Sequence, residues 1–163
     1  MRPFSISTVV DVPRERVFEY LADIANHAEF TGEYLHDFHL ERLESSGVGA
    51  AASYRIMFPL GRTWGESVIV ELDAPHLVRL EGQTGRLGRI KTKAAYRMTQ
   101  AGRDMTRVEY SFEAVPGSAG DRLKDLLGFR PWLTAKSRGG LQRLAKTLEE
   151  GRPSTHAATV AAG

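Results

Sequence analysis

The stretch SAGDRLKDLLGFRPWLTAKSRGGLQRLAKTLEE, residues 118–150, decides the fold of this chain. Its apolar residues recur at steps of three and four, and charged residues fall between them, which is typical of a long amphipathic helix. The apolar positions are Leu123, Leu126, Leu127, Leu133, Leu141, Leu144, Ala145 and Leu148. Because Pro131 has no amide hydrogen, we expect a kink or a break between Gly128 and Pro131.

A pair of glycines, Gly139 and Gly140, lies inside this predicted helix. Each glycine costs about 1 kcal/mol relative to alanine in a helix interior. Three explanations remain open: another backbone approaches the pair closely, a ligand does, or the pair is a tolerated weak point of a well-packed helix.

The sequence before this helix predicts mainly strands. Alternating apolar residues predict a first strand that Pro13 ends, followed by a short helix over residues 14–24 and a brief helical turn over residues 26–34 that Gly32 breaks. Apolar residues then alternate through six segments separated by short turns: residues 38–43, 52–58, 63–72, 77–82, 89–99 and 106–115. Short turns join antiparallel strands, since a parallel return needs a long crossover.

The sheet has one apolar face, and only the terminal helix is large enough to cover it. The sequence therefore predicts an α+β domain in which a curved, seven-stranded antiparallel sheet wraps around a long C-terminal helix, with two short helices between strands one and two. The domain spans residues 1–150, and residues 151–163, which are small and polar, predict a disordered tail.

Composition limits the possible partners. The net charge is only +2 and the basic residues are scattered among acidic ones, so we expect no nucleic-acid partner. The chain has no cysteine, which excludes disulfides and a cysteine nucleophile. No apolar run approaches the length of about 20 residues that a transmembrane helix needs. We expect a soluble cytoplasmic protein that is a monomer or a homodimer.

Alternation along the strands places bulky side chains on the face toward the helix, which favours a cavity between sheet and helix. The brief helical turn over residues 26–34 adds Phe30 and Tyr34, which are four residues apart, and we expect them to point the same way. We expect ligand contacts from Phe30, Tyr34, Tyr54, Phe58, Trp64, Glu66, Val68, Tyr96, Tyr110, Phe112, Leu133 and Gly140.

No residue is identified as catalytic, and Glu66 and Tyr96 are weak candidates. A buried Glu66 would have a raised pKa and could serve as a general acid or base, whereas near a strand end it would simply reach solvent. The histidines lack ligand spacing and the glycine-rich turns lack the context of a phosphate loop, so we expect neither metal nor cofactor. We interpret the basic run RLGRIKTK, residues 86–93, as a solvated strand end rather than a patch for an anionic ligand or a membrane surface.

The segment VPRERVFEYLADIANHAEF, residues 12–30, carries a resemblance to a known family. With the predicted order of elements it resembles the helix-grip superfamily of START-like and birch-pollen-allergen-like domains (SRPBCC), and within it the bacterial polyketide cyclase/dehydrase and lipid-transport proteins. Phe30 stands where many relatives have tryptophan. The segment GRTWGESV, residues 61–68, resembles an aromatase/cyclase strand in which Trp64 would supply an aromatic group to the cavity.

Three functions follow from the residues and the resemblance. The first is binding of a hydrophobic small molecule, such as a lipid, an isoprenoid or a polyketide, between sheet and helix. The second is a polyketide aromatase/cyclase or dehydratase that acts in the same cavity, so whether the protein is an enzyme stays open. The third and weakest is a protein-interaction module of the co-chaperone kind.

Overall fold

The computed structural model describes residues 1–117, 119, 128–151 and 159–160. The strands are β1 (Phe4–Val10), β2 (Leu35–Leu40), β3 (Ala51–Phe58), β4 (Gly61–Asp73), β5 (Leu77–Thr84), β6 (Ile90–Gly102), β7 (Met105–Val115) and β8 (Thr159–Val160). The helices are α1 (Arg14–Ala22), η1 (Ile24–Asn26), α2 (His27–Thr31), η2 (Arg86–Gly88) and α4 (Arg130–Glu149).

One curved sheet carries the fold, with the strand order β1-β7-β6-β5-β4-β3-β2-β8. Strands β1 to β7 pair antiparallel, which confirms the predicted seven-stranded sheet. The two residues of β8 pair parallel to β2 and add an eighth strand. The remainder of the predicted tail, residues 152–158 and 161–163, lies outside the described residues.

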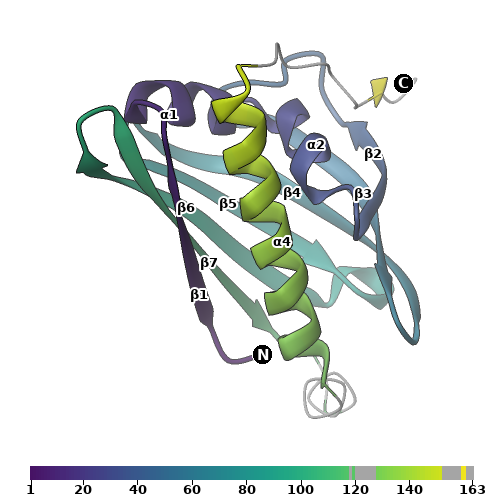
Figure 1. Ribbon diagram of the computed structural model, residues 1–163. Coiled ribbons are helices and arrows are strands. Elements are labelled where there is room, and N and C mark those ends of the chain that lie inside the picture. Colours follow the sequence, from purple (N-terminus) through teal and green to yellow (C-terminus); the bar gives the residue numbers. More distant parts are fainter. Residues whose placement is uncertain (118, 120–127, 152–158, 161–163) are drawn as a thin grey trace.

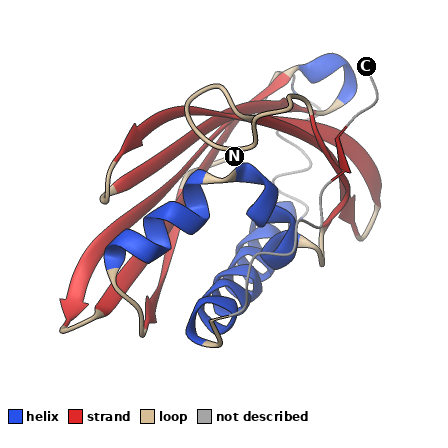
Figure 2. Ribbon diagram, turned by 90° about the horizontal axis from the view of Figure 1, so that it is seen from above, coloured by secondary structure: helices blue, strands red, loops and turns tan. Residues whose placement is uncertain are grey.

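Helix α4 lies across the concave face of the sheet, and α1 and α2 lie beside it near one end of the molecule (Figures 1 and 2). Its buried apolar side chains include Leu133, Leu141, Leu144 and Leu148, as the helical spacing predicted. The helix begins at Arg130, within the predicted break, and the preceding residues 118 and 120–127 lie outside the described part of the chain. The helix therefore begins within the predicted break, ends close to the predicted residue 150 and buries the predicted face.

The glycine pair in α4 is explained by the backbone of α2. A Cβ at Gly140 would lie 3.1 Å from the carbonyl oxygen of Phe30, and Arg143 donates a hydrogen bond from Nε to that oxygen at 3.1 Å. Ion pairs of Glu33 with Lys136 and Arg143 reinforce the contact. A close backbone approach thus accounts for Gly140, whereas Gly139 has no such neighbour.

Alanine substitutions should separate the two glycines. Gly139→Ala should raise the free energy of unfolding by about 0.5–1 kcal/mol, because its Cβ would meet only the Arg143 guanidinium, at 3.9 Å, and alanine favours the helix. Gly140→Ala should lose this gain or reverse it, since α2 must move away from α4. Urea unfolding measures both changes. An equal gain in stability from the two variants would contradict the close approach.

The alternation predicted for β4, which placed Trp64, Glu66 and Val68 toward the cavity, is wrong over the first half of the strand. Ile69 is completely buried, so Gly65 and Ser67 share the inner face, and Glu66 is exposed. A β-bulge between Ile69 and Glu71 inserts one residue, after which Leu72 again packs against the core. An unbroken alternation through residues 63–72 therefore assigned the residues before the bulge, including Glu66 and Val68, to the wrong face.

Candidate functional site

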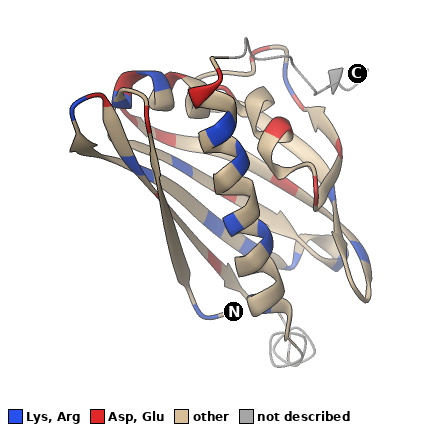
Figure 3. Cartoon of the chain, viewed as in Figure 1, with Lys and Arg blue, Asp and Glu red and all other residues tan. Residues whose placement is uncertain are grey.

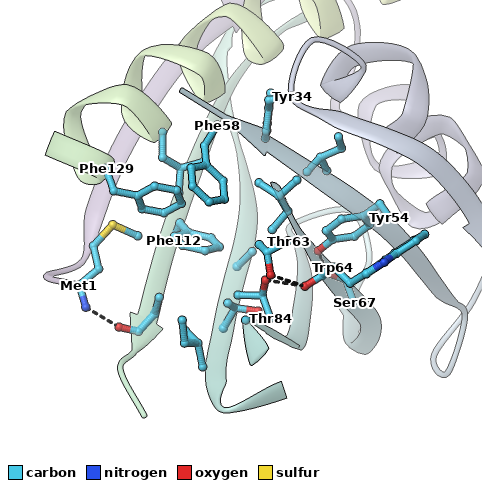
Figure 4. A pocket seen from close by; sticks show the side chains of 18 of the residues that line it. Met1, Tyr34, Tyr54, Phe58, Thr63, Trp64, Ser67, Thr84, Phe112 and Phe129 are labelled. Carbon is cyan, nitrogen blue, oxygen red and sulfur yellow. Dashed lines mark hydrogen bonds between the residues drawn. The ribbon is translucent and has the colours of Figure 1, made fainter. Parts of the chain in front are cut away.

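An apolar cavity of about 1120 Å³ lies between the sheet and α4. Strands β2 to β7 form its wall, and α2 and the first turn of α4 close one side of it (Figure 4). It extends to the turn between β3 and β4, to η2 and to Met1, whose ammonium group donates a hydrogen bond to the Ala114 carbonyl at 2.7 Å. This volume is enough for a ligand larger than a typical drug molecule.

Many aromatic rings line this cavity. Tyr96 and Tyr110 lie side by side, with ring centroids 4.9 Å apart. Phe58 meets Phe129 edge to face at 5.8 Å, which joins the end of β3 to the residue before α4. The rings present large, rigid apolar surfaces, so the cavity suits a ligand with extended apolar area.

Two glycines leave the inner face of β4 and β5 without side chains. Gly65 pairs with Tyr54, and a Cβ at Gly65 would lie 2.8 Å from the Tyr54 ring. Gly82 pairs with Ser67 and with Thr92, and a Cβ there would lie 2.0 Å from the carbonyl oxygen of Glu66. Neighbouring atoms therefore approach both glycines too closely for a side chain.

A few polar groups reach the cavity. The Tyr54 and Ser67 hydroxyls share a hydrogen bond of 2.6 Å, and Thr84 donates one to the Trp64 carbonyl at 2.8 Å. Burial raises the pKa of Tyr34 to about 12, and it raises the pKa of Tyr96 and of Tyr110 well above the ordinary value for a phenol. At neutral pH these phenols stay protonated, so they can donate hydrogen bonds but cannot act as bases.

His27, on α2, is the buried histidine of the cavity wall. Its Nε2 lies 2.9 Å from the Leu21 carbonyl, which only accepts, so Nε2 carries the proton and Nδ1 is the acceptor. Its ring stands edge to face with Tyr96, with centroids 5.6 Å apart. Burial lowers the pKa of His27 to about 4, although the Leu21 carbonyl and Asp23 favour the charged form. The imidazole is therefore neutral at neutral pH.

Eight predicted ligand contacts lie in the cavity wall: Tyr34, Tyr54, Phe58, Trp64, Tyr96, Tyr110, Phe112 and Leu133. The structure places the other four elsewhere. Glu66 and Val68 lie outside the wall for the reason given for β4, and Glu66 accepts a hydrogen bond from Gln83. Phe30 and Gly140 pack against each other behind the wall. The carboxyl of Glu66 is thus not placed to act on a molecule in the cavity.

Trp64 borders the cavity in a different way from the one predicted. Its indole is 53% exposed and points away from the cavity (Figure 4). The guanidinium of Arg55, its partner across the strand pair, lies 5.1 Å from the centre of the indole ring. This cation–π contact holds the indole on the outer face.

The polar residues of the wall that sequence reasoning missed include His27, Ser67 and Thr92. His27 precedes Phe30 by three positions and Tyr34 by seven, so helical spacing could have placed it with them. Ser67 was hidden by the bulge in β4. Thr92 has the same parity as Ala94 and Tyr96, so alternation along that strand could have placed it with them.

The part of the chain that the structure describes contains no group of three or more histidine, aspartate or glutamate side chains able to hold a metal ion. None of the helices in that same part combines the length and the apolar character needed to cross a bilayer.

The sequence of residues 1–149 matches the family described as polyketide cyclase / dehydrase and lipid transport. The chain belongs to this family. Family membership agrees with the resemblance of residues 12–30 and with the sheet that curves around α4. A comparison with curated proteins finds no match in sequence.

Solved structures share the fold of this family member at low sequence identity. An aromatase/cyclase from Streptomyces sp. R1128 is 14% identical, with a TM-score of 0.74 over 91% of this chain and 94% of that one. A protein of Thermus thermophilus is 13% identical, with a TM-score of 0.70 over 93% and 100%. Norcoclaurine synthase from Thalictrum flavum is 14% identical, with a TM-score of 0.67 over 91% and 87%. At such identities the likeness establishes the fold alone.

Proposed function

We propose that the protein binds a hydrophobic small molecule, such as a lipid, an isoprenoid or a polyketide, in the cavity between the sheet and α4. The observation that supports this most is an apolar cavity of about 1120 Å³ whose buried polar groups are protonated phenols, hydroxyls and one neutral imidazole, while its charged lining residues, Arg62, Glu81 and Arg86, are exposed. Burial of ligand surface would stabilise the complex by about 25 cal/mol per Å². Tyr96 and Tyr110 would orient a ligand oxygen by donating hydrogen bonds.

Native mass spectrometry of the purified protein, followed by extraction and identification of bound molecules, tests this proposal. We expect a stoichiometric hydrophobic compound, or a rise in melting temperature with one member of a panel of lipids, quinones and polyketides. A protein that is empty and whose melting temperature no compound changes would contradict it.

A cavity-filling substitution locates the bound molecule. Thr92→Phe adds a ring beside the bare backbone of Gly82, so it should abolish copurification of the ligand or weaken its binding by roughly tenfold or more. Lys93→Phe adds the same ring on the exposed face of the same strand and should bind as the wild type does. Glu66→Gln should also leave binding unchanged. Equal binding by Thr92→Phe and Lys93→Phe would place the ligand elsewhere.

A polyketide cyclase or dehydratase is the second candidate, favoured by His27 and Tyr96 standing together in the wall. In an aldol closure, a base removes a proton from the methylene between two carbonyls, the carbanion attacks a distant carbonyl, and the new alkoxide takes a proton. Tyr96 would donate to the carbonyl oxygen, and Nδ1 of His27 would accept the proton. Loss of cyclisation of a linear poly-β-ketone in both Tyr96→Phe and His27→Gln, with binding retained, would support this activity.

A further inference from the structure

Two leucines stand exposed at the entrance of the cavity. Leu60, in the turn between β3 and β4, is 83% exposed, and Leu87, in η2, is 82% exposed. Both border the same cavity, although they come from different turns. Single exposed apolar side chains are common on protein surfaces, but two at one cavity entrance form a local feature that needs an explanation.

The backbone of Leu87 adds to this requirement. Its φ of 62° and ψ of 27° lie in the left-handed region, which is unfavourable for a large side chain. Gly85 and Gly88 lie nearby, but the residue with this left-handed backbone at position 87 is a leucine and not a glycine. Packing within the chain does not compensate for the strain, because the side chain is largely in solvent. Such a combination is typical of a residue kept for an external contact.

The two turns are also strongly basic. Residues 59–63 and 84–91, the turns with the adjoining strand ends, hold four basic side chains and no acidic one, although the whole chain has a net charge of only +2. The four are Arg62, Arg86, Arg89 and Lys91, and the nearest acidic residues in sequence, Glu66 and Glu81, lie farther along β4 and β5. Figure 3 shows blue segments on these turns, at the end of the sheet away from α1. The loop between β2 and β3 is less basic: its exposed Leu43 is preceded by Glu41 and Arg42 and followed by Glu44.

We propose that this rim, defined as Leu60, Arg62, Arg86, Leu87 and Arg89, docks the protein on the surface of an anionic lipid bilayer. The leucines enter the boundary between headgroups and acyl chains, and the arginines bind lipid phosphates. A solvated strand end, which the sequence suggested for residues 86–93, leaves the leucines unexplained. An acidic protein partner fits this rim less well than a bilayer does. The two leucines stand on separate turns, with Arg62 and Arg86 between them in the sequence, and they form no continuous apolar face.

Docking would place the cavity entrance next to the lipid acyl chains, in which apolar molecules dissolve. In this sense the inference extends the proposed function by naming where the ligand enters and leaves. The docking itself requires no bound ligand, so the two proposals are tested separately.

Sedimentation with sucrose-loaded vesicles tests the docking. We expect the full-length protein to bind phosphatidylcholine vesicles that contain about one third phosphatidylglycerol, and to bind pure phosphatidylcholine roughly tenfold more weakly. Raising the salt from about 0.1 M to about 1 M, which shortens the Debye length from about 10 Å to about 3 Å, should release most of the protein.

Paired variants identify the rim. The double change Leu60→Ser and Leu87→Ser should weaken vesicle binding by at least roughly tenfold, and so should Arg86→Gln with Arg89→Gln. The matched control, Leu43→Ser with Val48→Ser, removes exposed apolar side chains from the loop between β2 and β3 and should bind as the wild type does. Circular dichroism melts check that each variant is folded.

Three outcomes would overturn the proposal: no binding of the wild type to anionic vesicles, equal loss in the rim and control variants, or arginine-dependent capture of an acidic protein without vesicle binding. A failure of the proposed ligand binding would appear instead in the Thr92→Phe comparison, with vesicle binding intact.

Discussion

Replacing Gly82 with alanine should destabilise the protein by more than about 3 kcal/mol. A Cβ at this position would lie 2.0 Å from the carbonyl oxygen of Glu66, which belongs to the main chain and cannot rotate away as a side chain would. Strands β4 and β5 would have to separate in the middle of the sheet and lose the pairing of Gly82 with Ser67. Urea unfolding followed by circular dichroism measures the loss.

Gly139→Ala is the matched control for this substitution, because it adds the same methyl group where the nearest atom is 3.9 Å away. The two variants should therefore move the unfolding midpoint in opposite directions. A Gly82→Ala protein as stable as the wild type would show that β4 and β5 are farther apart than described.

The second large effect is a loss of stability in acid that depends on His27. Its pKa is about 4 in the folded protein and about 6.5 in an unfolded chain. Between these values the unfolded chain binds a proton that the folded protein does not, so the free energy of unfolding falls as the pH decreases from about 6.5 to 4. At pH 4.5 the loss attributable to this one group should be on the order of 2 kcal/mol.

His27→Gln removes the titrating group and keeps an amide that can donate to the Leu21 carbonyl. The variant should show a smaller difference in unfolding free energy between pH 7 and pH 4.5, whatever its absolute stability. His36→Gln, a change at an exposed histidine, should keep the full difference. If both variants retain the wild-type dependence, His27 is not the group that binds the proton.

The fold was predictable because it depends on periodicity. Steps of three and four residues predicted the buried face of α4, and Pro131 with Gly128 predicted where this helix begins. Short turns between alternating segments required an antiparallel sheet. Local irregularities were harder to see: β2 begins at Leu35, before the predicted residue 38, and a register shift between His36 and His39 interrupts its pairing.

The cavity wall was predictable only where alternation was unbroken. Tyr54, Tyr96 and Tyr110 lie as expected because β3, β6 and β7 keep their alternation through these positions. In β4 the bulge before Glu71 moved Glu66 to the outer face and brought Ser67 inside. A bulge leaves little trace in a sequence, since it changes which residues pair and not which residues are present.

The two bare positions beside the cavity, Gly65 and Gly82, have a consequence for engineering the ligand range. A Cβ at Gly65 would meet the Tyr54 ring and one at Gly82 the Glu66 carbonyl, so substitutions at these positions would disturb the sheet before they changed ligand selectivity. Redesign should instead begin at Thr92 and Ala94, whose side chains border the cavity from β6. A library built there would vary the chamber while sparing the frame that creates it.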